Sequence, residues 1–126
     1  MAASAWQLYN YAKRYIGNGT ITLGAGVFKM VLARSASNAS TFTLSTYASV
    51  TNEISATGGY VTGGKNLVPA TGQWTVGASA KQMKFTMSTV GLAFTASGAS
   101  LTNIKYAILR NSTGAGAGKL LCFCQL

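Results

Sequence analysis

The chain has 126 residues, the size of one domain with a substantial core. Ten lysines and arginines face one acidic residue, Glu53, which gives a formal net charge of +9, and the chain has no histidine. Paired carboxylates, a Ser-His-Asp triad and metal sites built from imidazole and carboxylate groups are therefore excluded, and we expect no catalytic site, no cofactor and no metal.

The surface is expected to be poor in charge. Charged residues make up 9% of the chain, against about 25% in ordinary soluble domains. A free monomer normally stays soluble through interspersed charge, so we interpret this surface as one covered by neighbours, in a homo-oligomer or on a protein lattice. No run of about 18 apolar residues predicts a membrane span, the opening lacks a secretory signal pattern, and no small-molecule substrate is expected.

The positive charge limits the classes of binding partner that this chain would attract. An acidic protein, nucleic acid and an anionic membrane all attract cations by the same Coulomb terms. Only Lys13 and Arg14 are adjacent, and the other cations are spaced along the chain. Nucleic-acid sites usually cluster cations on one face, so we favour an acidic protein partner.

Residues 4–16 predict a short amphipathic helix, with Ser4 at the N-cap and Gly17 just past its end. Apolar residues recur at helical spacing at Leu8, Tyr11, Ala12 and Tyr15. Nearly every side of this helix carries an apolar or aromatic residue. The segment therefore either packs on its own sheet or forms an arm that reaches a neighbouring subunit.

Residues 18–126 change to a period of two and predict a β-domain, with the whole of residues 1–126 forming a single domain. We expect a mainly β fold, an antiparallel β-sandwich or small barrel of about seven strands. The expected extended segments are 27–34, 41–44, 47–54, 73–76, 81–87, 92–95, 102–110 and 119–126, with a flexible loop at 111–118.

Two of these segments carry further predictions. Phe28, Met30 and Leu32 alternate with Lys29, Val31 and Ala33, which predicts a half-buried strand. The last strand is apolar on both faces, so it is central or paired with another protomer. Cys122 and Cys124 within it are expected to be buried free thiols. We interpret Trp6, Trp74, Tyr60 and Phe28 as packing residues rather than binding anchors.

The stretch 50–67, VTNEISATGGYVTGGKNL, organises the rest of the chain in this interpretation. Its glycine pairs predict positive φ and a folding hinge that turns one strand back across the sandwich. Glu53 is expected to pair with a Lys or Arg, within the subunit or across an interface. Gly63→Val or Gly64→Val is expected to cost about 1–3 kcal/mol. The stretch also fits the opening of a phosphate-binding loop, but Asn66 stands where the Mg²⁺-binding hydroxyl is needed. The hinge candidates are Glu53, Gly58, Gly59, Tyr60, Gly63 and Gly64.

Several segments together resemble small β-rich virion proteins encoded among the structural genes of tailed bacteriophages. The segments are the opening with YNYAKRYIGNGTI, the strand VFKMVLARS, the bend NEISATGGYVTGGKNL, the strand IKYAILRN and the finish KLLCFCQL. In that group an FKMAL-like strand precedes a bend of the form E-[IV]-x-G-x-GY-x-x-GG, and a late strand carries Y-A-[IV]. The chain departs from the group at residues 23–26, which lack the usual acidic residues, and in its positive charge.

The resemblance implies a non-enzymatic virion component, present in the host cytoplasm during assembly. We favour a capsid decoration (cement) protein on an acidic capsid surface, with the major capsid protein or another virion protein as partner and a trimer as one form of homo-oligomer. The alternatives are a tail or fibre component acting as adaptor or host-binding module, and a minor head protein contacting DNA. The interface candidates, each of which can also serve only solubility, are Lys13, Arg14, Lys29, Arg34, Lys65, Lys81, Lys84, Lys105 and Arg110.

Overall fold

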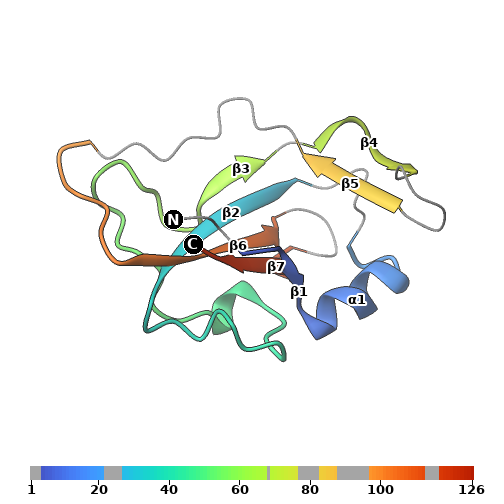
Figure 1. The fold of residues 1–126 in the computed structure, drawn as a ribbon, viewed down its shortest axis with the longest axis horizontal. Helices are drawn as coiled ribbons and strands as arrows, with labels where there is room; N and C mark the ends of the chain where they lie inside the picture. The colour runs from blue at the N-terminus through green and yellow to red at the C-terminus, as the bar shows by residue number, and fades with distance from the viewer. Residues whose placement is uncertain (1–3, 22–26, 68, 77–82, 88–96, 113–116) are drawn as a thin grey trace.

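The fold is mainly β, with one short helix (Figure 1). The computed structural model describes residues 4–21, 27–67, 69–76, 83–87, 97–112 and 117–126. In chain order the elements are β1 (Gln7–Leu8), α1 (Asn10–Gly17), β2 (Phe28–Arg34), the 3-10 helix η1 (Tyr47–Ser49), β3 (Lys65–Leu67), β4 (Pro69–Val76), β5 (Met83–Met87), β6 (Ile104–Asn111) and β7 (Leu120–Gln125).

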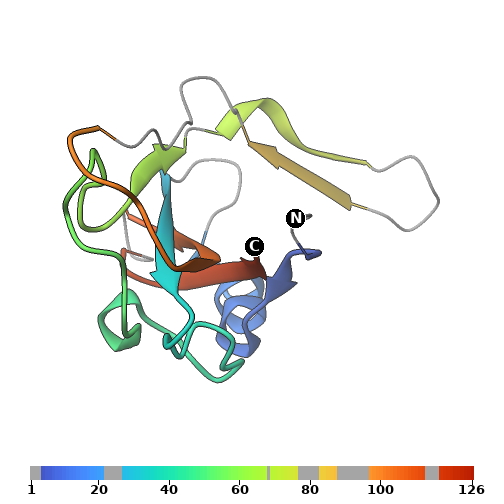
Figure 2. The same ribbon diagram turned by 60° about the vertical axis from the view of Figure 1, so that its left-hand side comes forward.

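Five strands form one open antiparallel sheet in the order β1-β7-β6-β2-β3, and β4 pairs with β5 as a separate hairpin. Figures 1 and 2 show this hairpin extending away from the larger sheet, on the side of β3. The predicted mainly β, antiparallel character is confirmed, but the sandwich or barrel of about seven strands is not. The described strands lie in one sheet and one projecting hairpin, so no second layer of strands covers the sheet.

The three inner strands of the sheet, β7, β6 and β2, have buried side chains on both faces. The register places Val31 beside Ile108 and Ile108 beside Phe123, and the next row places Leu32 beside Ala107 and Ala107 beside Cys124. Neighbouring rows point to opposite faces of a sheet, and all these side chains are buried. The prediction that 27–34 is half-buried is therefore wrong, because both faces of β2 are covered along its second half.

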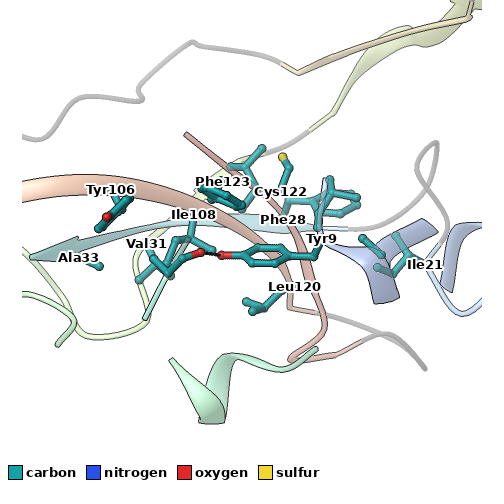
Figure 3. Close-up of a cluster of buried hydrophobic side chains, with 14 residues drawn as sticks. Tyr9, Ile21, Phe28, Val31, Ala33, Tyr106, Ile108, Leu120, Cys122 and Phe123 are labelled. Atoms are coloured by element: carbon teal, nitrogen blue, oxygen red, sulfur yellow. Dashed lines mark hydrogen bonds between the residues drawn. The ribbon is translucent and has the colours of Figure 1, made fainter. Parts of the chain in front are cut away.

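The buried apolar side chains form two clusters, and Tyr9, which precedes α1, belongs to the larger one. Figure 3 shows its ring pointing into the cluster, toward Val31 and Ile108. The ring lies 5.0 Å from that of Phe123, and the hydroxyl donates to the Ala39 carbonyl. Burial raises the pKa of Tyr9, so the hydroxyl remains a donor at neutral pH.

The helix is shorter than the sequence predicted. It covers Asn10–Gly17 with Tyr9 at the N-cap, so the predicted start at Ser4 is wrong. The Ser4 N–H donates to the Gln125 carbonyl and its hydroxyl accepts from the Gln125 N–H, which places Ser4 beside β7. Gly17, expected just past the helix, is its last residue, and Asn18 is the C-cap. Backbone pairing along β7 has replaced the first helical turns.

Some of the other predicted strands are present in the structure and some are not. Residues 41–44 form turns rather than a strand, and 47–54 begins with the 3-10 helix η1. The strands predicted at 27–34, 102–110 and 119–126 correspond to β2, β6 and β7. β7 lies between β1 and β6, which confirms that the last strand is central. The segments at 73–76 and 81–87 are matched by β4 and β5, while 92–95 and residues 113–116 of the 111–118 loop lie outside the described residues.

Candidate functional site

The stretch 50–67 forms the outer partner of β2, and this partner is split in two. Glu53 bridges Ala33, with hydrogen bonds from Arg34 N–H to Asn52 and from Ile54 N–H to Leu32 on either side. The chain then leaves the edge for residues 55–64 and returns as β3, which pairs with Phe28–Met30. The hinge was expected to reverse a strand, but the chain rejoins the edge that it left, in the same direction.

Glu53 ties the excursion together. Its Oε1 accepts from the Tyr60 hydroxyl at 2.6 Å and from the Gly63 N–H at 2.7 Å, and its Oε2 accepts from the Tyr47 hydroxyl. The Tyr60 hydroxyl also accepts from the Leu32 N–H at 3.2 Å. We call Glu53, Tyr47, Tyr60 and Gly63 the Glu53 cluster. It joins both ends of the excursion, η1 and the central strand β2.

Arg110 closes the cluster from β6. Its Nε and Nη2 donate to the Gly63 carbonyl at 3.2 and 3.1 Å, and its guanidinium carbon lies 4.4 Å from the centre of the Tyr47 ring. The expected ion pair between Glu53 and a basic residue of the same chain is not formed in the described part of the structure. The hydroxyls of Tyr47 and Tyr60 and the Gly63 N–H bind the carboxylate instead. The Arg110 guanidinium binds the Gly63 carbonyl.

Both tyrosines of the cluster are held protonated. Burial, followed by the hydrogen bond to Glu53, raises the pKa of Tyr47 to about 12 and raises that of Tyr60 as well. Each phenol therefore acts as a hydrogen-bond donor to a carboxylate rather than as an acid or base near neutral pH. The arrangement is suited to holding the excursion in place.

The glycines of the bend have the backbone that the sequence predicted. Gly58, Gly59, Gly63 and Gly64 all have positive φ, between 62° and 94°. A Cβ at Gly64 would lie 2.0 Å from the Met30 carbonyl oxygen, and one at Gly58 would lie 2.5 Å from that of Ala99. These two positions need glycine for close approach as well as for backbone conformation.

Strand register gathers four cations at one end of the sheet. Lys29 of β2 lies opposite Arg110 of β6, on the same face. Lys65 of β3 lies opposite Met30, at the same sheet end but on the other face. Lys119 precedes β7, where its carbonyl accepts from the Asn111 N–H, and its ammonium lies 5.2 Å from the centre of the Tyr15 ring. We call Lys29, Lys65, Arg110 and Lys119 the basic sheet end.

The other predicted interface residues lie elsewhere. Arg34 and Lys105 are at the opposite end of the sheet, where Arg34 pairs with Ile104. Lys13 and Arg14 are exposed on α1. Lys81 and the side chain of Lys84 lie outside the described residues. Of the nine candidates, the structure places Lys29 and Arg110 side by side, with Lys65 at the same sheet end on the opposite face.

The sequence interpretation missed three residues of these sites. Tyr47 was assigned to an extended segment, Tyr15 only to the apolar side of the helix, and Lys119 was not a candidate. Lys119 follows a glycine-rich loop and opens a strand, a position that could have indicated a cation at a sheet end. The contacts of Tyr47 depend on the turn into η1, which has no clear sequence signal.

The predictions of which side chains are buried are confirmed for some residues and not for others. Phe28 and Tyr60 are buried as expected, and Cys122 and Cys124 are buried free thiols, as predicted. Trp6 is 46% exposed and therefore does not belong to the buried core. The side chain of Trp74 lies outside the described residues.

Within the described residues, no group of three or more His, Cys, Asp or Glu side chains is placed to hold a metal ion, and no helix has the length and hydropathy of a membrane span. Comparisons with protein-family models, with curated proteins and with solved structures find no match.

Proposed function

We propose that this chain is a non-enzymatic structural protein of a tailed-phage virion, which docks by its basic sheet end onto an acidic surface of the capsid. The role is that of a decoration (cement) protein, with the major capsid protein as partner. The resemblance of the strands and of the glycine bend to phage virion proteins supports this assignment.

The observation that carries the proposal is the excess of positive charge at the basic sheet end. Four of the ten basic residues meet at one end of the sheet, and the single carboxylate of the chain is bound by two hydroxyls and an amide. Glu53 is the only acidic side chain against these four cations, so positive charge predominates at this end of the sheet. Such a surface favours association with an acidic partner and raises its association rate.

Binding to purified expanded capsids that lack the protein tests this role. We expect saturation at a fixed high copy number and an affinity that falls as salt rises. The double variant Lys29→Gln/Lys119→Gln should weaken binding by about tenfold or more, equivalent to about 1.4 kcal/mol. The double variant Arg34→Gln/Lys105→Gln removes the same charge at the opposite sheet end and serves as the matched control.

Other outcomes reject the proposal in distinct ways. Equal losses in the two double variants contradict docking by the basic sheet end. A handful of copies per purified virion contradicts the cement role and favours a tail or fibre adaptor. Retention of DNA by the isolated chain at physiological salt, without capsid binding, favours the minor head protein.

A further inference from the structure

Exposed apolar side chains gather around β1. Six large apolar residues of the described chain are at least 36% exposed, and four of them surround this strand. Trp6 and Leu8, at 46% and 41%, belong to the β1 segment, and Tyr11, at 41%, follows on α1. Phe42, at 44%, packs 5.5 Å from the Phe123 ring, and its carbonyl accepts from the Asn10 N–H. We call these four residues the β1 edge patch.

The backbone of β1 also has an open side. β1 is an edge of the five-stranded sheet and pairs only with β7 among the described strands (Figure 1). The Tyr9 N–H donates to the Leu121 carbonyl. Backbone groups in an antiparallel ladder alternate between the two sides, so those of Gln7 point toward β7 and those of Trp6 and Leu8 point outward. An outward row of this kind is a template for another strand.

We infer that the β1 edge is the contact between two copies of this chain, paired antiparallel about a twofold axis at Gln7. In this arrangement Trp6 of each copy lies opposite Leu8 of the other, on the same face, and the outward backbone groups bond in pairs. Tyr11 and Phe42 flank the strand. An antiparallel pair of identical strands is self-complementary and closes as a dimer, so the assembly does not extend into a filament.

A second copy fits this edge better than an acidic partner does. Residues 4–10 carry no charged side chain, and neither does β7 beside them. Two chains of net charge +9 repel each other least through such a neutral region, while an acidic surface gains no ion pair there. Short edge strands in natural proteins are commonly protected by charge, and this one is bordered by aromatic side chains instead. The inference does not depend on the proposed capsid role.

Sedimentation of the full chain over a range of concentrations provides the test. We expect a monomer–dimer equilibrium that strengthens as salt screens the repulsion, which is opposite to the salt dependence expected for capsid docking. Trp6→Lys and Leu8→Lys should each weaken the dimer by about tenfold or more. Val61→Lys is the matched control, because Val61 is 67% exposed on the excursion and not at this edge. A monomer at all concentrations overturns the inference, as does equal weakening by the control.

A covalent test reports the geometry directly. Facing residues of a non-hydrogen-bonded antiparallel pair lie about 4.5 Å apart at Cα, which a disulfide can span. Gln7→Cys should therefore form a disulfide-linked dimer in mild oxidant, with two thiols losing two electrons to the oxidant and two protons to solvent. The variant Val61→Cys should not. A dimer by sedimentation without crosslinking through residue 7 overturns the twofold pairing, and pairing with another protein's strand would appear as a mixed complex that excludes the dimer.

Discussion

Tyr60 and Glu53 are joined by a hydrogen bond of 2.6 Å, and the same tyrosine hydroxyl accepts the backbone N–H of Leu32 at 3.2 Å. Tyr60 thereby links the only acidic side chain to a central strand. This link, the Gly63 N–H bond to Glu53 and the Arg110 contact with the Gly63 carbonyl hold the excursion of residues 55–64. Its stability should respond to small changes in the cluster.

Tyr60→Phe should lower the free energy of unfolding by about 1–3 kcal/mol, because a buried N–H and a carboxylate oxygen each lose a partner. Tyr47→Phe is the comparison, since Tyr47 is only half-buried and water can replace its hydroxyl at Glu53. Urea unfolding of the two variants measures the difference. Equal losses would show that burial does not decide the energy of these bonds.

Gly64→Ala should destabilise the chain by about 3 kcal/mol or more, because left-handed strain adds to a backbone clash. The new Cβ meets the Met30 carbonyl oxygen at 2.0 Å. Gly98→Ala is the matched control, with a φ of +76° and no atom within 4 Å of the added Cβ. The control should cost about 1–2 kcal/mol from conformation alone. Similar losses in both would remove the close approach as a cause.

Stability should fall at alkaline pH through the Glu53 cluster. Tyr47 has a folded pKa of about 12 and Tyr60 is also raised, while an ordinary tyrosine ionises near pH 10. The unfolded chain therefore loses these protons first, and the contribution of the cluster is complete below about pH 10 and is lost as pH rises through about 12. The difference in unfolding free energy between wild type and Tyr60→Phe should shrink across this range. A difference that does not change with pH would contradict the raised pKa values.

Arg110→Lys should separate the folding role of this residue from its charge. Lysine keeps the positive charge but cannot form the two-donor contact with the Gly63 carbonyl. We expect a loss of about 1–2 kcal/mol in unfolding free energy, with capsid binding unchanged. Reduced binding by a fully folded variant would show that docking needs the guanidinium of Arg110 and not only its charge.

The two thiols should resist modification in the folded protein. Burial raises the pKa of Cys122 to about 12 and also raises that of Cys124, so little thiolate is present at neutral pH. Reaction with a thiol reagent should follow the rate of unfolding and become fast in denaturant. Rapid reaction of the native chain would show that β7 opens locally.

The sequence was informative where local pattern decides structure. Alternation in β2 and β6 predicted both strands, and the apolar character of β7 predicted its central place. The glycine pairs predicted positive φ, because no other residue adopts it as freely. The basic sheet end could not be predicted, since it depends on the register that sets Lys29 opposite Arg110, two residues far apart in sequence.

The N-terminal segment shows why the start of the helix could not be predicted from local sequence. Its apolar spacing fits a helix from Ser4, and local propensity alone favours that choice. Hydrogen bonds from Ser4 and Tyr9 to β7 compete with the first helical turns, and they prevail because β7 offers a long row of backbone partners. Tertiary pairing of this kind overrides propensity and leaves no local signal. The partners of Glu53 escaped prediction for the same reason.

The place of β7 between β1 and β6 has a consequence for biosynthesis. The hydrogen bonds between Ser4 and Gln125 join residues 121 positions apart, so the ladder has a high contact order. While the ribosome is still translating β7, β1 and β6 lack the strand that separates them, and their apolar residues are open to other chains. The sheet should therefore complete only after synthesis of this region, slowly compared with a helical domain of the same size, and aggregation during expression should be most severe in variants that slow the docking of β7.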